Sequence, residues 1–285
     1  MSISRVGLDG RALGNINRYR GIGHYTANMV KSLVRVGGNL QFVLFAYGKA
    51  GDCDLLDQDT ISQLEWREIP ETGKLSYISL LREHLLFAGV IDDAGLDIFH
   101  AMDHNMTPFL HCPNIVTVHD LILLVLRGPY LGPTAWLWMQ AHRRAARKAS
   151  KVVAVSHNTA QDVERIWGIP AERIAVVHEG VSESYRPAAD DVIEDAAARY
   201  GIERPYFLYL GGFDPRKNIL NMLLAFKRFL LAGGTPYQLI LCGDARGFED
   251  YLHDNIVELG LNGNVVLTGF VEKEDLPALY SGATA

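Results

Sequence analysis

The chain has 285 residues, of which 48% are hydrophobic and 21% are charged, so it is long and apolar enough to form two soluble domains. Its formal net charge of −6 argues against general nucleic-acid binding, which requires a basic surface. The charge is uneven, because residues 1–187 hold 19 Lys+Arg and 19 Asp+Glu, whereas residues 188–285 hold 8 and 14.

Strand-like and helix-like segments alternate along the first half of the chain. Runs rich in β-branched and aromatic residues predict strands at 5–8, 41–47, 64–69, 97–100, 115–118, 151–155 and 173–177. Helical periodicity predicts helices after Gly21 and at 75–90, 134–150 and 157–167. This alternation indicates a parallel, doubly wound sheet, in which ligands bind beyond the carboxyl ends of the strands. The aliphatic run 121–126 suits a buried strand or loop.

Gly21 and Gly23 lie where the first strand gives way to a helix. The free N–H groups of such a helix start can bind an anion. A tight strand-to-helix turn without a ligand explains the same pattern, so both interpretations stay open at this point.

Polar residues follow two of the later strands. Asp103 and His104 come just after 97–100, and His119 and Asp120 come just after 115–118. An imidazole can exchange hydrogen bonds with a sugar hydroxyl or a phosphate oxygen near neutral pH. The structural alternative is a histidine that only satisfies a loop carbonyl.

Two acidic motifs, Asp52-Cys-Asp54 and Asp57-Gln-Asp59, match the Asp-x-Asp pattern of metal-dependent transferases. Because no strand end fixes the carboxylates and hard cations need several convergent oxygens, we interpret them as an acidic surface loop and predict no metal site.

The predicted helix 134–150 carries tryptophans at its start and arginines and a lysine at its end. Such a helix can dock on an anionic membrane. Core packing of the aromatic residues, with cations at the negative end of the helix dipole, is the interpretation that we favour.

Residues 188–285 repeat the pattern, with strands predicted at 206–210, 238–242 and 264–267 and helices at 190–200, 249–259 and 275–280. The strand 206–210 leads into Gly211 and Gly212, after which Asp214 and Pro215 predict the start of a helix that runs to about 232. Arg216, Lys217 and the N–H groups of this helix would form an anion site, most naturally for phosphate. A solvated Arg–Lys pair is the alternative.

These motifs, in this order, resemble the GT-B glycosyltransferases, above all the retaining family 4. The resemblance covers nearly the whole chain and rests on GIGHYTANMVKSL, VTVHDL, KVVAVSHNTAQDV, RIAVVHEGVSESYRP, YLGGFDPRKN and LILCGDARG. It implies an α/β fold of two Rossmann-like, doubly wound parallel-sheet domains. Residues 1–187 would form the acceptor-side domain and residues 188–285 the nucleotide-sugar (donor) domain.

The resemblance also implies roles for individual residues. Lys217, assisted by Arg216, would stabilise the leaving diphosphate, and His119 would lie beside the transferred sugar. Donor binding would involve Gly21, Gly23, Gly211, Gly212, Gly243, Asp244, Phe270 and Val271. Asp103, His104 and Asp120 would lie on the acceptor side.

The sequence departs from the family pattern in two places. Gly212 stands where many members have an arginine, and the pair of glutamates with seven residues between them is expected beyond Ala285. Glu164 and Glu172 have that spacing but lie in the wrong domain. After Pro187 only 98 residues remain, fewer than the roughly 150 usual for a domain, so we expect the donor domain to be incomplete.

The resulting prediction is a retaining, metal-independent transferase that moves a hexose, by mild preference mannose from GDP-mannose, to a glycan or lipid-linked acceptor. The alternative is a catalytically incomplete nucleotide-sugar-binding or split-enzyme half. A dehydrogenase is disfavoured, because the first turn lacks a full dinucleotide motif. Three widely spaced cysteines, no signal-peptide pattern and no bilayer-length apolar run predict a cytoplasmic protein, with peripheral contact to the inner face of the membrane left open.

Overall fold

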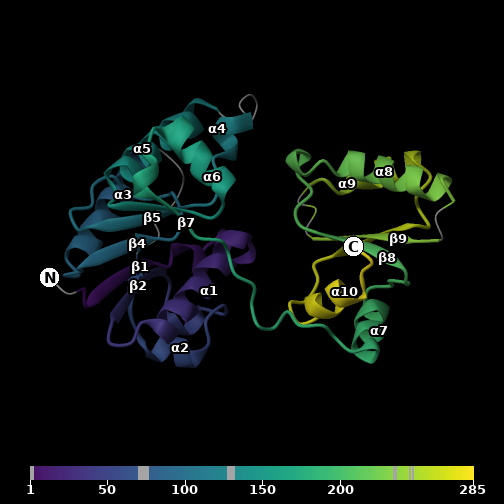
Figure 1. The fold of residues 1–285 in the computed structure, drawn as a ribbon, viewed down its shortest axis with the longest axis horizontal. Coiled ribbons are helices and arrows are strands. Elements are labelled where there is room, and N and C mark those ends of the chain that lie inside the picture. The colour runs from purple at the N-terminus through teal and green to yellow at the C-terminus, as the bar shows by residue number, and fades with distance from the viewer. Residues whose placement is uncertain (1–2, 70–76, 127–131, 234–235, 244, 246) are drawn as a thin grey trace. The chain divides into compact units, whose positions relative to one another are not determined.

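The structure is a computed structural model that describes residues 3–69, 77–126, 132–233, 236–243, 245 and 247–285. The chain divides into two compact units, Met1–Gly180 and Val181–Ala285. Each unit has its own sheet and its own apolar core (Figure 1). Within the described ranges, no helix is both long enough and apolar enough to cross a lipid bilayer.

The described part of the first unit contains a seven-stranded sheet with the order β3-β2-β1-β4-β5-β6-β7, and every neighbouring pair is parallel. The strands are β1 (Arg5–Asp9), β2 (Gln41–Tyr47), β3 (Leu64–Ile69), β4 (Ile98–Ala101), β5 (Asn114–Val118), β6 (Lys151–Ala154) and β7 (Ile174–Val176). The strand order reverses between β1 and β4, which is the point where ligands commonly bind in open α/β sheets.

Helices cover both faces of this sheet. They are α1 (Gly21–Val36), α2 (Gln58–Ser62), α3 (Tyr77–Asp92), α4 (Ile122–Leu126), α5 (Pro133–Lys148) and α6 (His157–Asp162). Because successive strand side chains point to opposite faces, Phe42 and Leu44 of β2 pack in the core that includes residues of α1, whereas Val43 and Phe45 pack in the core that includes residues of α3 and α5. A strand buried on both faces explains the continuous apolar run of β2.

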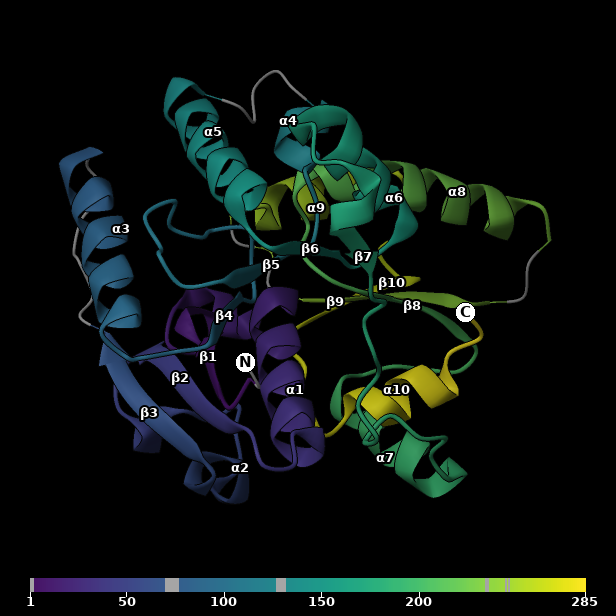
Figure 2. The same cartoon turned by 60° about the vertical axis from the view of Figure 1, so that its left-hand side comes forward.

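The second unit is a smaller version of the same architecture. Its strands β8 (Tyr206–Leu210), β9 (Gln238–Cys242) and β10 (Val265–Gly269) form a parallel sheet with the order β10-β9-β8. Its helices α7 (Asp190–Arg199) and α10 (Leu276–Gly282) cover one face, and α8 (Ile219–Leu231) and α9 (Glu249–Glu258) cover the other (Figures 1 and 2).

The free side of β8 is occupied by the last residues of the chain. The amide of Thr284 donates to the carbonyl of Tyr206 over 2.8 Å, and the amide of Leu208 donates to the carbonyl of Ala285 over 2.9 Å. This side of the sheet is therefore paired along part of its length.

In the first unit, three segments differ from the prediction. The aliphatic run 121–126 contains the short helix α4 rather than a strand, and the Asp120 carboxylate accepts a hydrogen bond from the amide of Ile122, the first residue of that helix. Residues 157–167 begin as α6 but widen into a π-helical turn at Val163–Trp167. Helix α2 was not predicted, although Asp57 caps it through the amide of Thr60.

Candidate functional site

His119 follows β5 at the carboxyl edge of the first sheet, as predicted. Its Nε2 atom lies 3.0 Å from the carbonyl oxygen of Met102, and its Nδ1 atom lies 3.1 Å from Oε1 of Glu179. The ring of Tyr25 packs edge-on against the imidazole, with 4.6 Å between the ring centroids. The backbone is also held, because the Thr159 hydroxyl donates to the carbonyl of His119.

The two contacts of the His119 ring differ in kind. A carbonyl oxygen only accepts hydrogen bonds, so Nε2 must donate to Met102. An ionised Glu179 also only accepts, so Nδ1 donates to it only when the ring is protonated, and Nδ1 of a neutral ring that carries its proton on Nε2 is an acceptor. The Glu179 side chain is 52% exposed, whereas that of His119 is 13% exposed. The inner contact therefore fixes the ring, and the outer contact can be exchanged for a hydroxyl group.

Asp103 and His104 form an ion pair beyond β4, with 2.8 Å between the carboxylate oxygen and Nδ1. Burial alone would raise the pKa of Asp103, but the charge and backbone amide of His104 and the charge of His119 lower it. Burial alone would lower the pKa of His104, but Asp103 raises it. The pair thus favours its charged form in spite of its position, and both side chains are about one-fifth exposed, at 22% and 21%.

A neighbouring histidine stays neutral. The ring of His142 on α5 lies 5.3 Å from that of His104 between centroids, and burial lowers the pKa of His142 to about 3, helped by the charge of His104. Asp120, the other predicted acceptor-side residue, is exposed, and its carboxylate caps α4. Asp120 therefore has a structural role whether or not it contacts a substrate.

The two glycines at the start of α1 have different surroundings. A side chain on Gly23 would meet the backbone of the preceding turn, at 2.5 Å from the carbonyl oxygen of Asn17 and 2.6 Å from the Cα atom of Arg18. A side chain on Gly21 would meet no atom within 4 Å. Gly23 is therefore explained by packing, and Gly21 leaves open space over the first N–H groups of the helix.

The turn after β8 begins differently from the prediction. Asp214 caps a single 3₁₀ turn, Pro215–Lys217, and the long helix α8 begins only at Ile219. Asn218 joins the two in the left-handed region, with φ of 57° and ψ of 37°. The N–H groups of α8 therefore start two residues beyond Lys217.

The two cations of this turn are not equivalent. The Nε atom of Arg216 donates to the Asp214 carboxylate over 2.8 Å, and this contact lowers the pKa of Asp214. Lys217 is exposed at the end of the turn. Asp214 therefore offsets the charge of Arg216, whereas Lys217 presents its ammonium group to solvent.

Glycines lie at the carboxyl ends of all three strands of the second sheet. The amide of Gly211 donates to the carbonyl of Cys242, and the amide of Gly243 donates to the carbonyl of Gly269. A Cβ atom on Gly243 would lie 2.1 Å from the carbonyl oxygen of Gly211. Three adjacent strand ends thus meet through backbone alone, and Gly212 follows with space around it. Such an edge lets a ligand approach the backbone closely.

Two predicted donor-binding residues follow β10, and a third lies outside the described residues. The Phe270 side chain is 67% exposed, whereas Val271 is 5% exposed and belongs to the core on the α7 and α10 face. The side chain of Val271 is thus committed to the core, so any contact of this residue with a ligand would be through its backbone. Asp244 is the residue outside the described ranges.

Sequence reasoning missed the partners that hold His119. Glu179 was not among the predicted site residues, although it follows β7 and so lies at the same sheet edge as His119. The buried pair Asp9–Arg11 was also missed; Arg11 Nη2 lies 2.8 Å from Asp9 Oδ2, and the same guanidinium donates to the carbonyl of Asn105. A carboxylate at the end of a strand was the signal in both cases.

The fold of the chain is that of the GT-B class, as solved glycosyltransferase structures show. A glycosyltransferase from Rickettsia africae is similar over 99% of this chain and 72% of its own, with a TM-score of 0.68 and 18% identity. The HepE protein of Anabaena, crystallised with UDP and glucose, is similar over 98% of this chain and 72% of its own, with a TM-score of 0.70 and 16% identity.

The chain belongs to glycosyltransferase family 4. Residues 19–185 match the profile of "Glycosyltransferase Family 4", and residues 193–285 match that of "Glycosyl transferases group 1". O-antigen chain mannosyltransferase B of Escherichia coli is 33% identical over 171 residues, which are 59% of this chain and 45% of that protein. The alpha-D-kanosaminyltransferase of Streptomyces kanamyceticus is 29% identical over 194 residues, 67% of this chain and 49% of its own.

A third relative shows the same partial coverage. The serotype-specific mannosyltransferase WbdA of Escherichia coli is 22% identical over 96% of this chain but only 36% of its own length. The chain thus spans half or less of the length of these curated relatives.

Proposed function

We propose that this chain is part of a retaining hexosyltransferase that moves a sugar from a nucleotide diphosphate sugar to a hydroxyl of a glycan or lipid-linked acceptor. The observation that carries the proposal is the glycine-lined edge of the second sheet, which leads directly into the turn with Lys217. Bare backbone admits a polyphosphate, and a cation stabilises the negative charge that develops as the sugar–phosphate bond breaks.

Lys217 is the residue that we assign to the leaving diphosphate. Its exposed ammonium group can contact phosphate oxygens as a point charge. Arg216 plays a secondary part, because it must share its guanidinium group with Asp214. The charge of Lys217, with N–H donors from Arg216, can contact the diphosphate directly, which supports transfer without a metal ion. Asp57, which a metal site at the second acidic motif would need, instead caps a helix.

His119 is the residue that we assign to the transferred sugar. The bond from Nε2 to Met102 fixes the ring, and Nδ1 is then an acceptor for a sugar hydroxyl that displaces the exposed Glu179. Asp103 and His104 lie beyond the neighbouring strand β4, and we assign them to the acceptor side of the same sheet edge.

The donor sugar is inferred from the relatives. Two of them are named mannosyltransferases of Escherichia coli, which supports mannose, and by extension GDP-mannose, as the donor. HepE of Anabaena, which shares only the fold, has been crystallised with UDP-glucose, so UDP-sugars are the second choice. The mannosyltransferase names support a role in O-antigen or another surface polysaccharide.

We place the protein in the cytoplasm, with peripheral contact to the inner face of the membrane. Helices α4 and α5 expose Val125, Leu126, Trp136 and Leu137, each 45–52% accessible, and α5 ends in a basic cluster. Apolar and basic groups on neighbouring segments favour an anionic bilayer. Co-sedimentation with phosphatidylglycerol vesicles should fall on the change Trp136→Ser; binding that is equal in both proteins would contradict this placement.

The central test is the change Lys217→Ala in the full-length protein. We expect kcat for transfer from GDP-mannose or a UDP-sugar to fall about 100- to 1,000-fold, the range seen when one preorganised charge-stabilising group is removed. Arg228→Ala, an exposed cation near the end of α8, is the matched control and should retain activity.

The same experiments distinguish the proposed transferase from the alternative, a split-enzyme half. Undiminished transfer by Lys217→Ala would contradict the role assigned to Lys217, and no transfer by the unaltered full-length protein would contradict the transferase proposal. Nucleotide-sugar binding without transfer by the 285-residue chain, with transfer restored by a separately supplied C-terminal piece, would instead identify a split-enzyme half.

A further inference from the structure

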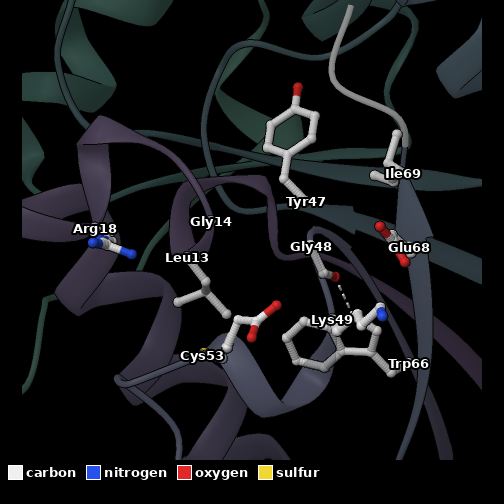
Figure 3. Close-up of a pocket in the computed structure, with 11 residues that line it drawn as sticks. Leu13, Gly14, Arg18, Tyr47, Gly48, Lys49, Cys53, Trp66, Glu68 and Ile69 are labelled. Carbon is white, nitrogen blue, oxygen red and sulfur yellow. Dashed lines mark hydrogen bonds between the residues drawn. The ribbon is translucent and has the colours of Figure 1, made fainter.

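A pocket of about 350 Å³ lies beside the carboxyl ends of β2 and β3, and none of its residues has a role in the proposed reaction (Figure 3). Its volume is within the range of small-molecule sites, roughly 300–1,000 Å³. Its lining combines two aromatic rings, Tyr47 and Trp66, with four charged side chains, Arg18, Lys49, Asp52 and Glu68.

The aromatic wall is held in place by the backbone. Trp66 on β3 donates from Nε1 to the carbonyl oxygen of Gly48 over 3.0 Å, which ties the indole to the turn after β2 (Figure 3). Gly14 approaches the same turn so closely that a Cβ atom there would lie 2.5 Å from the carbonyl oxygen of Tyr47. A fixed indole offers an apolar face without the entropic cost of ordering a mobile side chain.

The charged side chains that line the pocket sum to a net charge of zero. Arg18 and Lys49 supply two cations, and Asp52 and Glu68 supply two carboxylates. Figure 3 shows Arg18 on one side of the pocket and Lys49 and Glu68 on the other. A site built for an anion would carry an excess of cations. An apolar ring face surrounded by donors and acceptors of both signs instead suits a neutral, polyhydroxylated ring.

The pocket is linked to the surroundings of His119. Tyr47 also lines a second, smaller hollow of about 40 Å³, whose other lining residues include Met102 and Asp103. The carbonyl of Met102 is the group that fixes the His119 ring. Tyr47 therefore stands between the larger pocket and the residues that we assign to the reaction.

We propose that this pocket is an acceptor subsite, which holds a neutral pyranose unit of a glycan chain set back from the hydroxyl that reacts. The assignment rests on the proposed transferase function. It predicts that the protein prefers an acceptor with at least two sugar units, because one unit fills the pocket while another presents its hydroxyl.

The first experiment measures kinetics with the full-length protein and a methyl mannobioside acceptor. Glu68→Gln and Trp66→Ala should each raise the acceptor KM about tenfold, with the donor KM unchanged. Glu172→Gln, an exposed residue before β7, is the matched control for Glu68→Gln and should leave both constants unchanged. An acceptor KM that neither pocket variant alters would overturn the subsite.

The second experiment measures binding and does not depend on turnover. Saturation-transfer NMR with methyl α-D-mannopyranoside should give a signal from the 285-residue chain that Trp66→Ala and Glu68→Gln both reduce. Equal competition by glucuronate would overturn the neutral assignment, as would no signal from the unaltered chain. If the unaltered full-length protein transfers no sugar while this binding persists, the transferase proposal fails and the sugar pocket stands.

Discussion

The two units use the carboxyl edges of their parallel sheets in opposite ways. In the first unit the edge is filled with side chains that hold one another, such as His119 with Glu179 and Asp103 with His104. In the second unit three strand ends meet through backbone alone, and the exposed Lys217 follows in the turn after β8.

This difference determines which substitutions and which pH changes should disturb each unit. A side-chain network depends on hydrogen-bond geometry and protonation, so it responds to pH and to conservative substitutions. A glycine edge depends on the absence of atoms, so it responds to a single added methyl group and little to pH. The same fold therefore provides one unit with tunable polar groups and the other with a backbone surface.

The largest effect is expected from Gly243→Ala. The added Cβ atom would lie 2.1 Å from the carbonyl oxygen of Gly211, and Gly243 has a φ of +143° that other residues rarely adopt. We expect a loss of about 3–4 kcal/mol in the free energy of unfolding of the second unit, measured by urea denaturation. Gly263→Ala, where an added Cβ meets nothing within 4 Å, is the control and should change stability by about 0.5 kcal/mol or less.

Much of the fold could be predicted from the sequence, but this clash could not. The strands and most helices followed from apolar periodicity, and the placement of His119 and Gly211 at strand ends followed from the alternation of strand and helix. The contact between Gly243 and Gly211 joins residues 32 positions apart and leaves no local pattern. Glu179 was missed for the same reason, because its partner is 60 residues away.

The second largest effect is expected at His119. Replacement by Ala should lower kcat/KM about 100-fold, since it removes the only ring that we assign to the transferred sugar. Glu179→Gln should cost about fivefold or less, because a sugar hydroxyl displaces the carboxylate in the proposed complex. His111→Ala, whose side chain is 88% exposed, serves as the control. Equal losses on His119→Ala and on Glu179→Gln would show that Glu179 takes part directly.

A smaller effect, visible in its pH dependence, is expected from Asp103→Asn. Asp103 has a lowered pKa, so it contributes stability above its ordinary value of 3.8 that is lost as the pH falls. His104 has a raised pKa, so it contributes stability below its ordinary value of 6.5 that is lost as the pH rises through the raised value. The cost of the substitution, about 2 kcal/mol, should therefore be greatest between these two values.

The matched control for this pair is Asp92→Asn. Asp92 also pairs with a histidine, His111, over 2.8 Å, but that imidazole is mostly in solvent. Water screens an exposed pair, so its loss should cost about 1 kcal/mol or less. Urea denaturation at pH 5 and pH 8 compares the two variants, and a pH-independent cost at Asp103 would refute the ion-pair account.

The smallest effect is expected from Gly21→Ala, which tests whether the first unit also binds an anion through bare backbone. Gly21 leaves open space at the start of α1, much as Gly212 does after β8 in the second unit. Ala fits this space, so Gly21→Ala should stabilise the protein by about 0.5 kcal/mol through the unfolded chain. If the open N–H groups bind an anionic part of the substrate, the same methyl group should weaken substrate binding about fivefold, measured as KM. Higher stability with unchanged KM would show that Gly21 only starts a helix, and that anion binding by bare backbone belongs to the second unit.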